Sequence, residues 1–462
     1  MPSELQTLDA IDSGAPRKAI VPFEDRVAVS DLRSPRMVEV MRVPTIEELR
    51  EKLKVMGVPN NPALRDANLE TKIDALANFG RAYLPTFEVI TFVATLLAKV
   101  REVYCAKQFG GEEFRTYFHA AAGVMRGGKL RPLPACLSAI SATGFTLTGP
   151  SLMGRTAMLK RVVELLGKPF RVEGDHPAPR VMWVVPILYL GYPTCGTLEG
   201  LLRDMRDRIL AEVGRHDMNV NALAELEGIN GENVAIALCT LMNVGVFVLD
   251  GGGFSDVNGK TERIFRFLLK LREFAGIPVV ISGTSAFMYS SSYMGNLNSN
   301  LFNGPSLQMN PFRPPLPPRD GVENSKAKNG VWQQMNAWLW RQGLHPHSSQ
   351  MPDELPSWTY QAAYGRPGWL VQGFEALHLA LITKPELLNT GALTEKRVLA
   401  IFDMKLQLHN SARRAVARTV PPSAKGRASF IKNLDHLSTH DFDEPQVHEW
   451  LDEAMLRRAW NR

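Results

Sequence analysis

Short apolar runs alternate with helical stretches through the centre of the chain, and this pattern limits the possible folds more than any other feature. The apolar runs lie at 144–148, 181–190, 244–249 and 277–283, and the amphipathic stretches lie at 155–166, 198–213 and 262–274. Strands that alternate with helices of about 10–15 residues favour a parallel sheet covered on both faces. The run 244–249 is almost wholly apolar, as expected for a strand buried on both sides. We therefore predict an α/β fold for this region.

Helical patterns flank the central region. Residues 84–106 place Phe92, Leu96 and Val103 on a broad apolar stripe at helical spacing. Helices are also expected at 331–342, 368–382 and 394–408, after a proline-rich connector at 310–318 that suits neither a helix nor a central strand. We predict an N-terminal extension at 1–60, a helical N-terminal region at 61–140, the α/β core at 141–315, a second helical region at 316–410 and a C-terminal tail at 411–462.

The composition is that of a folded globular protein, because 45% of the 462 residues are hydrophobic and 22% are charged. The longest apolar stretch, 181–190, contains Pro186 and is far shorter than the ~20 residues that a membrane-spanning helix needs. No signal-peptide pattern follows Met1, so a cytoplasmic location and no membrane partner are expected. The net charge of +6 is compatible with a polyanionic partner, although many other proteins carry a similar charge.

Several conspicuous side chains have plain structural interpretations. The four cysteines form no C-x-x-C pair, which excludes a cysteine-cage zinc site and predicts buried, reduced thiols. His436 and His440 are four residues apart, but their polar surroundings favour surface histidines over a metal site. A group of tryptophans is expected to form core or interface contacts: Trp332, Trp338, Trp340, Trp358 and Trp369.

The most specific motif is Gly149-Pro-Ser-Leu-Met-Gly154-Arg155-Thr156, which follows a predicted strand and opens a predicted helix. This is the context of a phosphate-binding P-loop, G-x-x-x-x-G-K-[ST]. Its glycines let backbone N–H groups curl around a phosphate, and the helix N-terminus adds a favourable dipole. The candidate phosphate-binding residues are Gly149, Pro150, Ser151, Leu152, Met153, Gly154, Arg155 and Thr156, with the Thr156 hydroxyl as a Mg²⁺ ligand.

Arg155 stands where the P-loop motif has lysine. The lysine ammonium is a compact point charge, whereas a guanidinium is larger, planar and suited to a bidentate partner. Phosphate binding would then be weakened or re-oriented. The same residues also fit an ordinary strand–turn–helix with glycines in the turn, and the motif by itself leaves both interpretations open.

Asp250 and Thr284 end two of the predicted strands and strengthen the P-loop interpretation. Asp250 has the position of a Walker B aspartate, which would hold Mg²⁺, and Thr284 has the position of a sensor residue on the next strand. Gly251 follows Asp250, where active AAA+ ATPases have a glutamate that polarises the attacking water. Loss of such a base costs roughly 10²–10⁴ in rate. Asp256 and Glu262 are the next carboxylates that could replace it.

These segments together resemble the AAA+ ATP-binding regulators of transposition, the TnsC and TniB group, with the phage Mu B protein more distant. The resemblance covers about residues 80–385. The segment 185–201 is similar to the family pattern V-x-x-L-x-x-D-C-P-x-x-G-S-L-K-G-L. The other matching pieces, in order, are the P-loop strand 145–156, the strands that end at Asp250 and Thr284, and the segments 364–368 and 372–381, which fall where the family has a lid helix.

The resemblance implies a P-loop NTPase (AAA+) fold: a three-layer core with a parallel sheet, a helical N-terminal region and a helical lid at 316–410. It implies ATP or ADP with Mg²⁺, cradled by the P-loop, with Thr156 and Asp250 on the metal and Thr284 sensing the γ-phosphate. It also implies a homo-oligomeric ring or filament on double-stranded DNA, in contact with a transposase and a target-selector protein, in DNA recombination by a mobile element.

Three departures from the family pattern point to a degenerate member. They are Arg155, Gly251 and the stretch 285–311, which has no arginine. Related ATPases often place a trans-acting arginine in that stretch, worth about 10³–10⁵ in turnover. We therefore expect a pseudo-ATPase or very weak ATPase and assign no catalytic residue. Two alternatives remain open: an active DNA-stimulated ATPase of the same family, and a nucleotide-free scaffold in which Arg155 fills the phosphate site.

Overall fold

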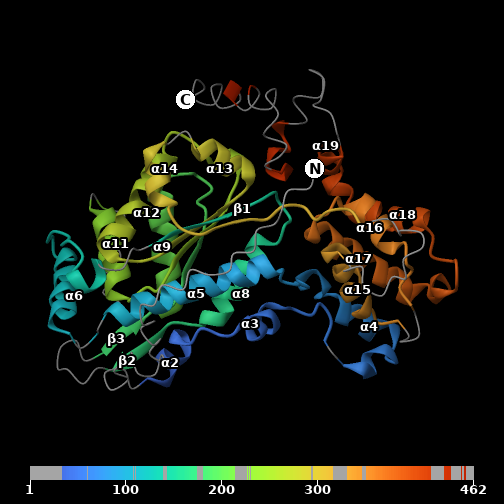
Figure 1. The fold of residues 1–462 in the computed structure, drawn as a ribbon, viewed down its shortest axis with the longest axis horizontal. Coiled ribbons are helices and arrows are strands. Elements are labelled where there is room, and N and C mark those ends of the chain that lie inside the picture. The colour runs from blue at the N-terminus through green and yellow to red at the C-terminus, as the bar shows by residue number, and fades with distance from the viewer. Residues whose placement is uncertain are drawn as a thin grey trace, which may run out of the picture.

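The structure is a computed structural model of the chain (Figure 1). It describes residues 34–59, 61–107, 111–138, 143–173, 181–213, 230–292, 295–315, 330–345, 350–417 and 431–438, with single positions at 109, 226, 228, 449, 452 and 453.

A five-stranded sheet forms the centre of the molecule, with strand order β4-β5-β6-β1-β7. The strands are β1 (Gly144–Thr148), β4 (Leu188–Gly191), β5 (Phe247–Gly252), β6 (Val279–Gly283) and β7 (Ser306–Gln308), and every neighbouring pair runs parallel. The register pairs Thr148 with Gly283 and Gly191 with Asp250. Because the strands are parallel, the C-terminal ends of β1, β5 and β6 meet at one edge of the sheet.

Helices cover both faces of the sheet. Val248 and Val280 face a core formed with α5 (Phe87–Lys107) and α8 (Arg155–Leu166). Their neighbours Phe247 and Ile281 face the opposite core, formed with α9 (Leu198–Val213), α11 (Gly231–Leu241) and α12 (Thr261–Ala275). Successive residues of a strand point to opposite faces, so each apolar strand contributes to both cores. The predicted three-layer P-loop fold is confirmed.

A separate helical unit lies beside the core (Figure 1). It contains α15 (Val331–Arg341), α16 (Leu355–Ala363), α17 (Pro367–Thr383), α18 (Glu395–Lys405) and α19 (Asn410–Val416). Trp332 and Trp369 are fully buried in its core, as the sequence predicts. Leu76 of α4 (Leu69–Leu76) and Phe79 are buried in the same core, so this part of the N-terminal region packs on the lid.

The N-terminal helices α2 (Pro35–Met41) and α3 (Ile46–Leu53) pack on the α/β core. Met37, Leu49 and Leu53 are fully buried there, beside α5 and α8. Thr45 begins α3 with a capping box, in which its hydroxyl accepts from the Glu48 amide and the Glu48 carboxylate accepts from the Thr45 amide. Part of the predicted N-terminal extension thus contributes to the α/β core. The domain boundary at residue 60 stays a proposal.

Further helices and a small second sheet lie between these elements in the sequence. The helices are α6 (Glu112–Val124), α7 (Ala135–Ser138), α13 (Ser285–Ser292) and α14 (Asn296–Leu301). A two-stranded antiparallel sheet pairs β2 (Phe170–Glu173) with β3 (Val181–Val184). Among the residues that the structure describes, no helix combines the length and apolar character that a membrane crossing requires.

Two sequence expectations are wrong in detail. The run 181–190 is not one strand but two, β3 and β4, which belong to different sheets. Pro186 lies between them and lacks an N–H for a continuous ladder. The cysteines are not uniformly buried, because Cys105 and Cys195 are exposed and Cys239 is buried; all three are reduced.

Candidate nucleotide-binding site

The predicted P-loop forms the connection between β1 and α8. Gly149 has φ +143° and Gly154 has φ +94°, in the region that favours glycine. A Cβ atom on Gly149 would lie 2.3 Å from the backbone oxygen of Met309, so the loop passes close to the segment after β7. Leu152 also has a positive φ, +70°, an uncommon conformation for a side chain of its size. The loop is thus held in a strained, curled form directly before a helix N-terminus.

Arg155 is the first residue of α8 and is partly buried. Burial lowers the pKa of its guanidinium to about 10, while the nearby carboxylates of Asp250 and Asp435 act in the opposite sense. Its Nη1 atom is buried without a hydrogen-bond partner among the described residues. A desolvated cation with an unused donor is suited to an anionic ligand.

Asp250 lies on β5 and is only 4% exposed. Its Oδ2 accepts a hydrogen bond of 2.7 Å from the hydroxyl of Tyr189 on β4. Its Oδ1 is buried and has no partner within the described part of the chain. A buried carboxylate oxygen without a donor is costly unless a cation approaches it, so Asp250 fits a Mg²⁺ ligand. Thr156, the second predicted metal ligand, is exposed beside Arg155.

Thr284 follows β6 and its backbone N–H donates to Gly252 at 2.8 Å, which joins the ends of β5 and β6. Gly251 has φ +95°, and open space lies where its Cβ would be. Neither predicted replacement carboxylate takes the missing position. Asp256 Oδ2 accepts from the Gly253 amide at 2.7 Å, and Glu262 pairs with Arg266 on the exposed surface of α12.

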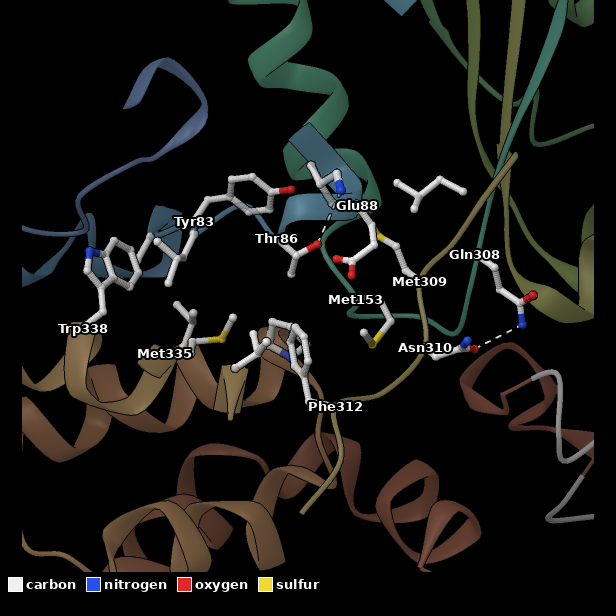
Figure 2. Close-up of a pocket in the computed structure, with 17 residues that line it drawn as sticks. Tyr83, Thr86, Glu88, Met153, Gln308, Met309, Asn310, Phe312, Met335 and Trp338 are labelled. Atoms are coloured by element: carbon white, nitrogen blue, oxygen red, sulfur yellow. Dashed lines mark hydrogen bonds between the residues drawn. The ribbon is translucent and has the colours of Figure 1, made fainter. Parts of the chain in front are cut away.

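A cavity of about 370 Å³ lies between the P-loop and the lid (Figure 2). Its walls come from the segment 82–89, Met153 of the P-loop, the segment 307–312 at the end of β7 and beyond it, and helices α15 and α17. The lining is mainly apolar, and Tyr83, Met153, Phe312 and Trp338 border it in Figure 2. Its volume falls within the roughly 300–1,000 Å³ of small-molecule pockets. The cavity adjoins the P-loop at Met153 and could receive the apolar part of a ligand whose phosphates lie on the loop.

The lid contacts the P-loop directly through the start of α17. The backbone N–H of Gly368 donates to the Leu152 oxygen at 2.9 Å. Arg366, two residues earlier, is 1% exposed and its guanidinium lies 5.0 Å from the ring centre of Trp369. This buried cation at the edge of the site was not singled out from the sequence as a site residue, although it lies within the lid segment that resembles the family.

A C-terminal segment also reaches the site, around the short 3₁₀ helix η10 (Leu434–His436). The Asp435 backbone oxygen accepts from the Ser151 amide at 2.7 Å. The Asp435 carboxylate accepts from the Phe254 amide at 2.8 Å and from the Thr284 hydroxyl. The interpretation of His436 as a surface histidine is wrong, because its ring stacks on Trp369 at an interplanar angle of 12°. His440 lies outside the described residues.

The fold therefore brings the P-loop, Asp250 and Thr284 to one edge of the sheet. Sequence reasoning missed Tyr189, Asp435 and the cavity, since these contacts join distant segments. Conservation across relatives would be the signal most able to find them. Within the described residues, no group of three or more His, Cys, Asp or Glu side chains could hold a metal ion.

No protein-family model matches the chain, and no curated protein matches it. Among solved structures, it is similar to the Aeropyrum pernix ORC1 protein in complex with DNA, with 14% identity and a TM-score of 0.35 over 68% of this chain and 69% of that chain. It is also similar to the Aeropyrum pernix ORC2 protein in ADPNP–ADP complexes, with 12% identity and a TM-score of 0.34 over 75% of this chain and 84% of that chain. At these TM-scores, neither similarity supports a conclusion about function.

Proposed function

We propose that the chain is a nucleotide-binding regulator of transposition with a degraded ATPase site. The observation that carries the nucleotide part is the meeting of three features: a curled P-loop, two charged side chains, Arg155 and Asp250, that each hold a buried polar atom without a partner among the described residues, and an adjacent apolar cavity. In this proposal the phosphates lie on Gly149–Thr156, and the base and sugar lie in the cavity. ATP or ADP is the ligand class.

Mg²⁺ would be held by the Thr156 hydroxyl and the free Asp250 oxygen, and it would neutralise phosphate charge when bound. Tyr189 orients the Asp250 carboxylate through its hydrogen bond to Oδ2, which leaves Oδ1 for the metal. Thr284 would contact the terminal phosphate through its hydroxyl.

Hydrolysis is expected to be poor. Gly251 carries no side chain to activate water, and Asp256 and Glu262 are engaged elsewhere. These contacts disfavour the alternative of an active ATPase with a displaced carboxylate. The nucleotide-free scaffold remains an outcome of the experiment below.

The transposition part of the proposal is supported by the sequence resemblance to the TnsC and TniB group. It includes assembly as a ring or filament on double-stranded DNA and contact with a transposase and a target selector. Arg413 in the basic C-terminal region is not a DNA contact in this proposal, because it is 8% exposed and pairs with Asp403 at 2.7 Å.

The test is equilibrium binding of a fluorescent ATP analogue with Mg²⁺ to the full chain. The variant is Thr156→Ala, and Thr71→Ala on the exposed surface of α4 is the matched control. Saturable binding that only Thr156→Ala weakens supports the nucleotide site. Absence of binding up to millimolar nucleotide would refute it and leave the scaffold. Anisotropy of labelled duplex DNA at low salt, with sedimentation for assembly, tests the DNA part in parallel. No DNA association and no assembly under any nucleotide condition would refute that part.

A further inference from the structure

The segment 433–437 occupies polar groups that the proposed nucleotide would need. Its contacts come from three parts of the site: the Ser151 amide in the P-loop, the Phe254 amide after β5 and the Thr284 hydroxyl after β6. All three are donors, and all three bind oxygen atoms of Asp435. A carboxylate that accepts a backbone amide and a hydroxyl uses the same kind of donors that bind a phosphate.

Two cations complete this arrangement. The Arg366 guanidinium donates a hydrogen bond to the His436 backbone oxygen. Burial lowers the pKa of the Arg155 guanidinium, and the negative charge of Asp435 opposes this fall by stabilising the protonated form. The negative charge and the carbonyl oxygens of the segment therefore lie on the side of the P-loop that faces Thr284 and the lid. The cavity beside Tyr83 and Met153 stays open, since no residue of this segment lines it.

The segment is anchored on both sides of Asp435. Leu434 and Leu437 are 2% and 1% exposed, and the His436 ring stacks on Trp369. Burial lowers the pKa of His436 to about 4, and the Arg366 charge acts in the same direction. The imidazole is consequently neutral at pH 7 and compatible with the cation beside it. Asp435 is thus held at a defined position and not attached by its charge alone.

We infer that residues 433–437 are an internal ligand of the phosphate site, and that Asp435 makes the site select a nucleoside diphosphate over a triphosphate. The Asp435 carboxylate takes the donors of the terminal phosphate, while the cavity and the rest of the P-loop remain available. A triphosphate must displace the segment, so its binding releases the C-terminal segment from the site. This inference rests on the proposed nucleotide function.

The experiment titrates the full-length protein with fluorescent Mg²⁺–ADP and Mg²⁺–ATP analogues. We expect the unchanged protein to bind the diphosphate more tightly. Asp435→Ala should strengthen triphosphate binding by roughly 10- to 100-fold, because this is the change in affinity that one hydrogen bond to a charged group typically gives. Diphosphate binding should change little. Asp435→Asn keeps an acceptor oxygen but loses the charge, so its triphosphate affinity should lie between those of the unchanged protein and Asp435→Ala. The control is Asp353→Asn, an exposed carboxylate.

A second measurement does not depend on nucleotide. Hydrogen exchange of the peptide that contains the Phe254 amide should accelerate in Asp435→Ala, because this amide loses its carboxylate acceptor, whereas the Ser151 amide keeps the backbone oxygen of residue 435. Leu434→Ala removes a buried anchor of the segment without changing charge, so it should accelerate exchange at both the Ser151 and the Phe254 amides. Thermal melts confirm that each variant is folded. Unchanged exchange in both variants would overturn the inference.

The failures of the two proposals are distinguishable. Thr156-dependent binding with the same triphosphate affinity in the unchanged protein and in Asp435→Ala leaves the nucleotide site standing and overturns the internal-ligand inference. If no nucleotide binds to any variant, including Asp435→Ala, the nucleotide function fails and the selection inference falls with it.

Discussion

Replacement of Arg155 by methionine should stabilise the protein and weaken its ligand binding at the same time. Arg155 begins α8 at the P-loop, and one of its guanidinium nitrogens is buried without a partner among the described residues. Methionine keeps an unbranched apolar stem of similar length and removes the charge. The change therefore isolates the cost of holding a desolvated cation at the P-loop of the ligand-free protein.

The pKa of Arg155 gives the size of the expected gain in stability. Burial lowers it from the ordinary 12.5 to about 10, net of the attraction to Asp250 and Asp435. At about 1.4 kcal/mol for each tenfold change in the ionisation constant, this fall corresponds to a destabilisation of up to about 3 kcal/mol. Because the folded-state pKa is the lower one, the unfolded chain holds the proton more tightly, and the cost is fully present at pH 7. It would diminish only above about pH 10.

Thermal and denaturant unfolding of the ligand-free protein measure the effect. A gain of 1–3 kcal/mol should raise the midpoint by several degrees, at roughly 2–4 °C per kcal/mol for domains of this size. Lys160→Met, an exposed cation on the same helix, is the matched control and should change stability by less than about 0.5 kcal/mol. Affinity for the fluorescent nucleotide should fall by roughly 10- to 100-fold in Arg155→Met. A lower unfolding midpoint in Arg155→Met would refute the reasoning, since it would mean that the fold already satisfies the guanidinium.

The remaining predictions concern the metal ligand, the missing base and a buried histidine. Thr156→Ala should reduce Mg²⁺–nucleotide binding at least about tenfold without lowering the melting temperature, because the side chain is exposed; a lower melting temperature would contradict this. Gly251→Glu enters open space at φ +95°, a strain of about 1–2 kcal/mol, and should raise phosphate release by up to about 10²-fold; unchanged release would show that the base is not what limits turnover. Burial, with a smaller contribution from His345, lowers the pKa of His378 to about 3. Because the unfolded chain binds this proton more tightly, the free energy of unfolding should fall as the pH drops below about 6.5, by up to about 1.4 kcal/mol per pH unit. Denaturant unfolding between pH 7 and 5 checks this, and His378→Phe should flatten the slope; an equal slope in both proteins would exclude His378 as its source.

The local pattern of the sequence is enough to predict most of the α/β core. The helices 155–166 and 198–213 are observed with the predicted bounds, because each is amphipathic and lies between segments that cannot continue it. The P-loop, Asp250 and Thr284 could be placed at one edge of the sheet because parallel strands align their C-terminal ends. This reasoning needs only the order of strands and helices.

The tertiary structure alone decides which distant groups complete the site. Tyr189 reaches Asp250 only because β4 and β5 are neighbours, a fact of strand order that the spacing of the motifs does not contain. The contact of Asp435 with Ser151 joins residues 284 positions apart in a polar tail that has no pattern of its own. Apolar periodicity reports which face of an element is buried, but not which element covers it. For this protein, the sequence predicts a phosphate-binding loop, and the long-range packing places a carboxylate in front of it.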